Sequence, residues 1–201
     1  MQRYAPGTAL IVVDVQNDFA DPAGSLSVAN GTALIPRINR EIEMARNKGG
    51  IVVATQDWHP PSTPHFAKDG GIWPVHCVAD TWGAELHPDL VIPADALRVR
   101  KGTKGEDGYS AFTMRDPVGG ETTPTELEGL LRARGIERVV LMGLATDYCI
   151  KATALDARRL GFETHVLTDA CAPVDLKPGD GVRAIDELEA AGVGMWRTVM
   201  R

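Results

Sequence analysis

Six runs of apolar and β-branched residues recur along the chain. They are apolar at nearly every position rather than at alternate positions, which is typical of strands buried on both faces of a parallel sheet. We expect strands at residues 9–15, 50–58, 96–102, 138–146 and 163–170, with a weaker sixth at residues 192–200.

Segments with helical periodicity lie between these runs. They predict helices at residues 32–48, 123–134, 147–160 and 181–191, and each segment is followed by a glycine, which is a good C-terminal stop. This alternation predicts a single α/β domain over residues 1–201. Its core would be an open, mostly parallel six-stranded sheet with helices on both faces, of the Rossmann-like kind.

Two stretches interrupt the alternation. Residues 58–95 hold four of the five histidines and three of the four tryptophans, and residues 102–122 are rich in glycine and charge. Neither is a linker between domains, because strands and helices resume after each. Long excursions inside a compact domain are usually functional, so we expect both to serve a site.

Composition narrows the class of protein. The chain of 201 residues is 44% hydrophobic and 24% charged, as in globular proteins. Its formal net charge of −6 argues against a partner that is nucleic acid or an anionic membrane, since both need a basic face. No leader sequence follows Met1 and no apolar run approaches ~18–20 residues. Together with three widely spaced cysteines (Cys77, Cys149 and Cys171), these features favour a cytoplasmic protein.

Reactive side chains follow four of the predicted strands. Asp14 ends the first run, Asp57 and His59 follow the second, Lys101 follows the third, and Cys149 follows the fourth. In an open parallel sheet, ligands bind outside the carboxyl ends of the strands. We therefore expect an acid, metal-type ligands, a base and a thiol to meet at one rim.

The segment DWHPPSTPH (57–65) has the composition of a metal site. Asp57 and His59 are two positions apart, so extended backbone would point both side chains to the same side. A carboxylate with neutral imidazoles suits Zn²⁺, with Mn²⁺ or Fe²⁺ as alternatives. His65 and His76 are the candidates to complete the set. The competing interpretation is a loop in which these residues have only capping and surface roles.

Cys149 is expected in the first turn of a helix, where the N–H groups and the helix dipole would lower the pKa of the thiol. Asp14 could take the thiol proton, and Lys101 could stabilise the resulting charges. Taken singly, these would be a buried structural cysteine, a turn residue and a solvated cation. Their expected convergence favours catalysis.

Five motifs together resemble the nicotinamidases of the isochorismatase-like cysteine hydrolases. They are VDVQNDF (13–19), DWHPPSTPHF (57–66), WPVHC (73–77), RKGT (100–103) and GLATDYC (143–149). The resemblance covers nearly the whole chain, in the order of the family. It implies a catalytic triad of Asp14, Lys101 and Cys149, and it implies metal ligands Asp57, His59 and His76. His65 falls where some members supply a further ligand and others do not.

The resemblance also implies a pocket for one pyridine ring. Phe19 and Trp73 match the aromatic residues that sandwich the ring, although either could be a plain core residue. Tyr109 is expected at the pocket mouth. The region 145–146 matches a family site with a cis peptide bond, and the backbone N–H groups of Ala145 and Cys149 are expected to face an oxyanion.

The implied activity is metal-dependent hydrolysis of nicotinamide to nicotinate and ammonia through a thioester, a reaction of NAD salvage, with pyrazinamide as a further substrate. Zn²⁺ is the favoured metal. One alternative is another amidase of the superfamily that acts on a carbamoyl or ureido substrate. A second is a non-catalytic binding protein with a degenerate site. The sequence leaves open whether the protein forms a homo-oligomer through sheet edges or helices.

Overall fold

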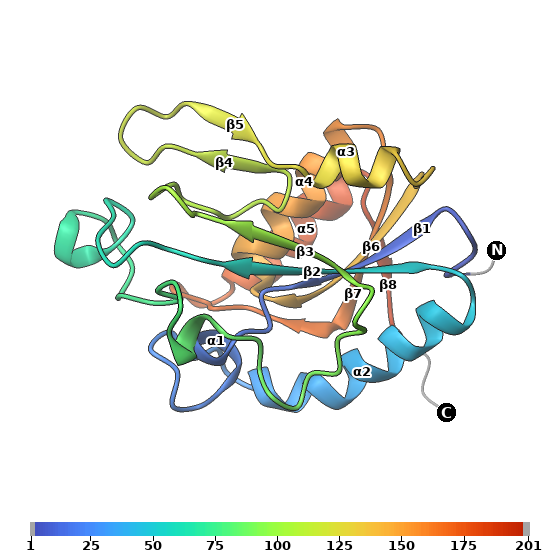
Figure 1. The fold of residues 1–201 in the computed structure, drawn as a ribbon, viewed down its shortest axis with the longest axis horizontal. Helices are drawn as coiled ribbons and strands as arrows, with labels where there is room; N and C mark the ends of the chain where they lie inside the picture. Colours follow the sequence, from blue (N-terminus) through green and yellow to red (C-terminus); the bar gives the residue numbers. More distant parts are fainter. Residues whose placement is uncertain (1–2, 199–201) are drawn as a thin grey trace.

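A six-stranded parallel sheet forms the centre of the computed structural model, which describes residues 3–198 (Figure 1). The strand order is β3-β2-β1-β6-β7-β8, and every neighbouring pair runs parallel. All six predicted strands are present: β1 (Thr8–Val13), β2 (Ile51–Asp57), β3 (Leu97–Lys101), β6 (Arg138–Leu144), β7 (Glu163–Ala172) and β8 (Gly194–Trp196). The last part of the predicted sixth strand, residues 199–200, lies outside the described residues.

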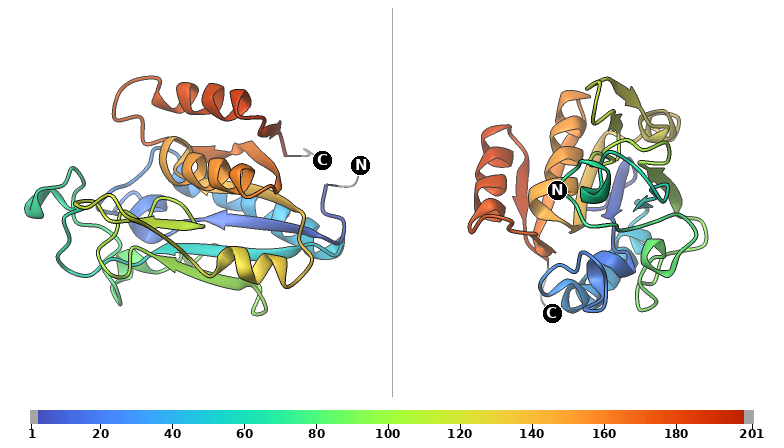
Figure 2. Two further views of the ribbon diagram at one scale, coloured as in Figure 1. Left: turned by 90° about the horizontal axis from the view of Figure 1, so that it is seen from above. Right: turned by 90° about the vertical axis from the view of Figure 1, so that its left-hand side faces the viewer.

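Helices cover both faces of the sheet, as predicted (Figure 2). On one face, α2 (Gly31–Asn47) buries Ile38 and Ile42 against Leu10 of β1, and the single-turn helix α1 (Asn17–Ala20) adds Phe19. On the other face, α3 (Leu127–Arg132), α4 (Lys151–Arg159) and α5 (Asp180–Ala190) contribute to a second core, which includes Ile11 of β1. Side chains of successive β1 residues thus pack into the cores on opposite faces of the sheet, which explains why the strand is apolar throughout.

Two predicted helices begin differently in the structure. The helix expected from residue 123 starts only at Leu127, because Thr122–Pro124 forms strand β5 and pairs antiparallel with β4 (Thr113–Arg115). β-branched threonines and a proline favour this extended segment over a helix. The helix expected over residues 147–160 is divided into a π-helical turn, Thr146–Ile150, and α4.

The chain order reverses at β1, whose neighbours are β2 on one side and β6 on the other. The loops that follow β1 and β6 therefore leave in opposite directions and open a crevice at the carboxyl ends of the strands. Gly143 lies in β6 at this point with a φ of +119°, and a Cβ there would be 2.2 Å from the carbonyl oxygen of Val13. Only glycine allows the two strands to approach this closely.

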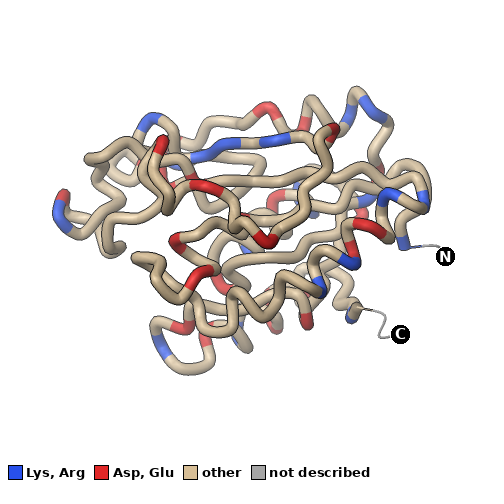
Figure 3. The backbone as a smooth tube through the Cα atoms, turned by 60° about the horizontal axis from the view of Figure 1, so that its bottom comes forward, with Lys and Arg blue, Asp and Glu red and all other residues tan. Residues whose placement is uncertain are grey.

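No helix among residues 3–198 is both long enough and apolar enough to span a lipid bilayer. Acidic and basic residues are interspersed along the backbone in the view of Figure 3.

The close approach at Gly143 predicts that alanine substitutions at two glycines will differ strongly in their effect on stability. Gly143→Ala should lower the free energy of unfolding by at least ~2 kcal/mol, because the new methyl group meets backbone at an unfavourable φ. Gly129→Ala in α3 should be neutral or stabilising by up to ~1 kcal/mol, since a methyl group there would meet no heavy atom within 4 Å. Urea denaturation of both variants measures the difference, and equal stabilities would contradict this account of the strand contact.

Candidate active site

The ammonium group of Lys101 lies at the centre of the predicted rim and is fully buried. It donates hydrogen bonds to Asp14 Oδ2 (2.6 Å), to Asp57 Oδ1 and to the carbonyl oxygen of Gly108 (2.5 Å). The sheet register produces this arrangement, since Asp57 and Lys101 are paired at the ends of β2 and β3. Burial alone would lower the pKa of Lys101, but the two carboxylates outweigh it and raise the pKa, so the group stays charged.

Asp14 follows β1 in a left-handed backbone conformation, with a φ of +49°. Thr55 of β2 fixes it there, because its hydroxyl donates to Asp14 Oδ1 (2.6 Å) and its oxygen accepts the Asp14 N–H (3.2 Å). Burial raises the pKa of Asp14 to about 6, against the opposing effect of the Lys101 charge. A carboxyl group with this pKa can exchange protons near neutral pH.

The sulfur of Cys149 lies 3.7 Å from the Lys101 ammonium, on the π-helical turn that follows β6. One oxygen each of Asp14 and Asp57 and this sulfur are all within 4.8 Å of one another. Turns of this kind are often found at functional sites. The structure thus brings together the three residues of the expected triad.

The expected lowering of the Cys149 pKa is wrong. Burial raises the pKa of the thiol, and Lys101 opposes this effect while Asp14 and Asp57 add to it. Cys149 is also on a π-helical turn rather than at the start of a regular α-helix, so the dipole argument does not apply as stated. The thiol therefore needs a base to give up its proton.

The carbonyl oxygen of Ala145 accepts hydrogen bonds from the N–H groups of Tyr148 and Ile150. Ala145 directly precedes the π-helical turn and Cys149 lies within it, so both expected oxyanion donors belong to the segment that carries the sulfur. The cis peptide bond lies between Leu144 and Ala145, one bond before the expected Ala145–Thr146 pair.

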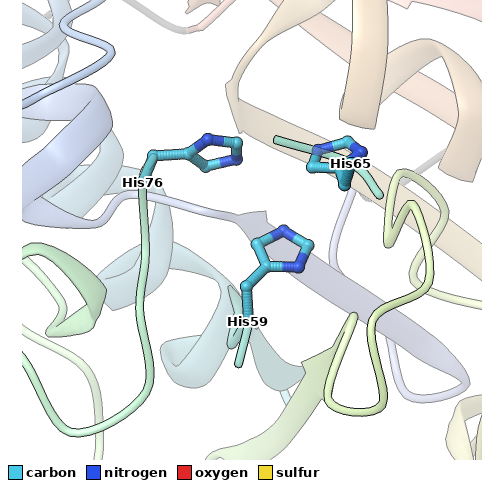
Figure 4. A group of neighbouring side chains, drawn as sticks. All are labelled: His59, His65 and His76. Atoms are coloured by element: carbon cyan, nitrogen blue, oxygen red, sulfur yellow. The ribbon is translucent and has the colours of Figure 1, made fainter. Parts of the chain in front are cut away.

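Three histidines converge beside this group (Figure 4). One ring nitrogen from each of His59, His65 and His76 lies within 4.8 Å of the others. Asp57 Oδ2 faces the same cluster, 3.8 Å from Nε2 of His59 and 3.9 Å from Nε2 of His76. Asp57 therefore uses one carboxylate oxygen for the lysine and presents the other to the histidines.

The donor set suits a divalent metal ion. His59 is fully buried, and neither of its ring nitrogens has a hydrogen-bond partner within the described part of the chain. Leaving buried polar atoms unpaired is costly, so a buried imidazole of this kind is suited to binding a cation. Nδ1 of His76 is 2.8 Å from the carbonyl oxygen of Pro74, which leaves Nε2 directed to the cluster. Asp57, His59, His65 and His76 thus fit a zinc-type site.

A cavity adjoins both groups. Phe19, Trp73 and Tyr109 line it, together with Cys149 and the histidines His65 and His76 of the cluster. The indole N–H of Trp73 donates to the hydroxyl of Tyr109 (2.8 Å), so residues from the two excursions close the same wall. Apolar walls with a few convergent polar groups are typical of small-molecule sites.

Sequence reasoning missed several residues that shape the site. Tyr148 lines the cavity with its ring 4.8 Å from that of Trp73, and its position next to Cys149 was the available signal. Gln16 holds both backbone groups of Asp57, donating to its carbonyl (2.7 Å) and accepting from its N–H (2.8 Å). No spacing rule predicts such a contact between a loop residue and the end of a strand.

Comparison with known proteins agrees with this architecture. The chain is 39% identical over 207 residues to the nicotinamidase of Escherichia coli, covering 95% of each chain. A pyrazinamidase of Pyrococcus horikoshii, solved in complex with zinc, superposes with a TM-score of 0.85 at 41% identity and covers 96% of this chain and 99% of its own. PnC1 of L. infantum, solved in complex with nicotinate, gives a TM-score of 0.87 at 37% identity and covers 98% of this chain and 96% of its own. Residues 8–197 match the Isochorismatase domain model, and the chain therefore belongs to that family.

Proposed function

We propose that this protein hydrolyses nicotinamide to nicotinate and ammonia, with Cys149 as nucleophile and a divalent metal in the histidine cluster. The observation that carries the proposal is the common cavity. A buried thiol beside an ammonium–carboxylate pair and a metal-type donor set open into one space suited to a small aromatic amide. The similarity to nicotinamidases supports the choice of substrate. Pyrazinamide, a heteroaromatic amide of the same size, is the second expected substrate.

The substrate ring would lie among the aromatic side chains of Phe19, Trp73 and Tyr109. The bound metal, with zinc favoured, would offer a position to the ring nitrogen and so hold the carboxamide over Cys149. His65 belongs to the proposed ligand set, together with Asp57, His59 and His76, because its ring nitrogen lies with the others.

The first half of the reaction needs a base, because burial keeps Cys149 protonated. Asp14 takes the thiol proton, and the sulfur forms a bond to the amide carbon. The N–H groups of Ala145 and Cys149 donate to the resulting oxyanion; one such donor is typically worth ~3–4 kcal/mol in the barrier. Asp14 then gives the proton to the leaving nitrogen as the C–N bond breaks, which releases ammonia and leaves a thioester.

The second half reuses the same groups. Asp14 removes a proton from water, and the hydroxide attacks the thioester carbon. The C–S bond breaks, Asp14 returns the proton it took from water to the sulfur, and nicotinic acid leaves and loses its own proton to solvent as nicotinate. Throughout, Lys101 stays charged between Asp14 and Asp57 and stabilises the thiolate at 3.7 Å.

Replacing the nucleophile tests the chemistry. Cys149→Ala should lower kcat for ammonia release from nicotinamide by ~10⁴-fold or more, because no other group can form the thioester. Zinc content and circular dichroism should be unchanged. Cys171→Ala is the matched control and should retain activity, since Cys171 lies on β7 and does not line the cavity. Substantial hydrolysis by Cys149→Ala would remove the nucleophile assignment.

The pH dependence tests the base. Asp14 acts as a carboxylate, and burial raises its pKa to about 6, so kcat/KM should fall as the pH drops through about 6. Zinc content measured at each pH is the control. Burial lowers the pKa of His76 to about 4, so this ligand should stay unprotonated through that range. A profile that is flat down to pH 5 would contradict the role of Asp14.

Removing a ligand tests the metal. His76→Ala should lower the zinc content of the purified protein and raise KM for nicotinamide by ~10-fold or more, since the ring would lose its anchor. His165→Gln replaces the one histidine outside residues 58–95 and should change neither quantity. Wild-type activity should also fall on treatment with a chelator and return with zinc. Full zinc binding by His76→Ala would exclude His76 from the ligand set.

A further inference from the structure

The Gly-rich excursion that follows Lys101 forms the outer wall of the histidine cluster. Gly102 has a φ of +72°, and a Cβ there would lie 2.4 Å from Cε1 of His59. The hydroxyl of Thr63 donates to the carbonyl oxygen of Gly105 (2.7 Å), which joins the wall to the histidine loop. Glycines in this segment therefore let the backbone approach the cluster closely.

A carboxylate from this wall reaches one of the three histidines. Oδ1 of Asp107 lies 3.3 Å from Nδ1 of His65. Both residues are buried, with 8% of Asp107 and 4% of His65 exposed. Asp107 also forms an ion pair with Arg115 at 3.5 Å, but the Arg115 side chain is 59% exposed, so this pair alone does not explain why the acid is buried beside His65.

Asp107 is itself held by the small hairpin outside the main sheet. Its N–H donates to the carbonyl oxygen of Arg115 in β4 (2.8 Å), and Nη1 of Arg115 lies 3.5 Å from Asp107 Oδ2. Strand β4 is in turn paired with β5. The hairpin thereby supports the carboxylate from behind and directs it toward His65.

The contact has a chemical meaning for a metal ligand. A carboxylate that accepts the Nδ1–H of an imidazole fixes its tautomer, leaves Nε2 free to bind a cation and makes that nitrogen a better donor. The carbonyl oxygen of Pro74 makes the same kind of contact with Nδ1 of His76, whereas His59 has no such partner among the described residues. Two of the three histidines are thus oriented through Nδ1.

We propose that Asp107 is a positioning residue that holds His65 as the fourth protein ligand of the metal, beside Asp57, His59 and His76. The inference rests on the metal site of the proposed function and extends it. It assigns a purpose to the β4–β5 hairpin: the hairpin holds the carboxylate that orients His65. The expected consequence is tighter zinc binding than Asp57 and two histidines alone would give.

Zinc affinity of the full-length protein tests the proposal. Asp107→Ala should weaken zinc binding by ~10–100-fold, measured by competition with a chromophoric chelator. Asp107→Asn should lose less, because its amide oxygen can still accept the Nδ1–H. Glu121→Ala removes an exposed carboxylate from the same excursion and should bind zinc like the wild type. Wild-type affinity in Asp107→Ala would overturn the proposal.

A second comparison separates positioning from general support of the fold. If Asp107 acts through His65, then Asp107→Ala should cause no further loss of zinc affinity in a His65→Ala background. The absorption spectrum of the Co²⁺-loaded protein should also change alike in the two single variants, because both lose the same ligand. An equal loss of affinity in the His65→Ala background would show that Asp107 acts by another route and would overturn the proposal.

The assay outcomes also distinguish this inference from the proposed function. Asp107-dependent zinc binding without ammonia release from nicotinamide would leave the inference standing and remove the function. Hydrolysis of nicotinamide, with zinc binding insensitive to Asp107, would remove the inference alone. A wild-type protein that binds no divalent metal ion would overturn both.

Discussion

A charged lysine buried between two carboxylates determines the layout of this site. Taking an ammonium group out of water is costly, and the cost is offset only where partners of opposite charge lie in good geometry. The parallel sheet supplies that geometry, because Asp14, Asp57 and Lys101 stand at the ends of three adjacent strands. The two carboxylates and one ammonium leave an excess of negative charge, which a bound divalent cation would offset.

Asp57 joins the two halves of the site through its two carboxylate oxygens. One accepts from Lys101, beside the thiol, and the other faces His59 and His76. One side chain at the end of β2 thus contacts the ammonium group beside the thiol and faces the metal cluster. Gln16 holds the backbone of that residue on both sides, so the linkage is rigid. A small substrate that spans the two groups would meet a preformed arrangement.

Much of this arrangement could be predicted from the sequence, for physical reasons. Continuous apolar runs identify strands that are buried on both faces of the sheet. Because ligands bind at the carboxyl ends of parallel strands, Asp14, Lys101 and Cys149, which follow such strands, are predicted to lie together. Contacts made by loop residues have no such signal, which is why Gln16 and Asp107 were missed. The exposed hairpin β4–β5 has no apolar run to reveal it. The pKa of Cys149 was misjudged because burial depends on packing around the sulfur, which helix position alone does not reveal.

The short sequence separation of the metal donors has a further consequence. All four proposed ligands fall between residues 57 and 76, whereas the nucleophile comes from residue 149. A chain with three histidines and an aspartate so close together can bind zinc before it folds. Ligand binding stabilises a protein only to the extent that it prefers the native over the unfolded state. Zinc would therefore raise the melting temperature by less than its affinity for the folded protein implies.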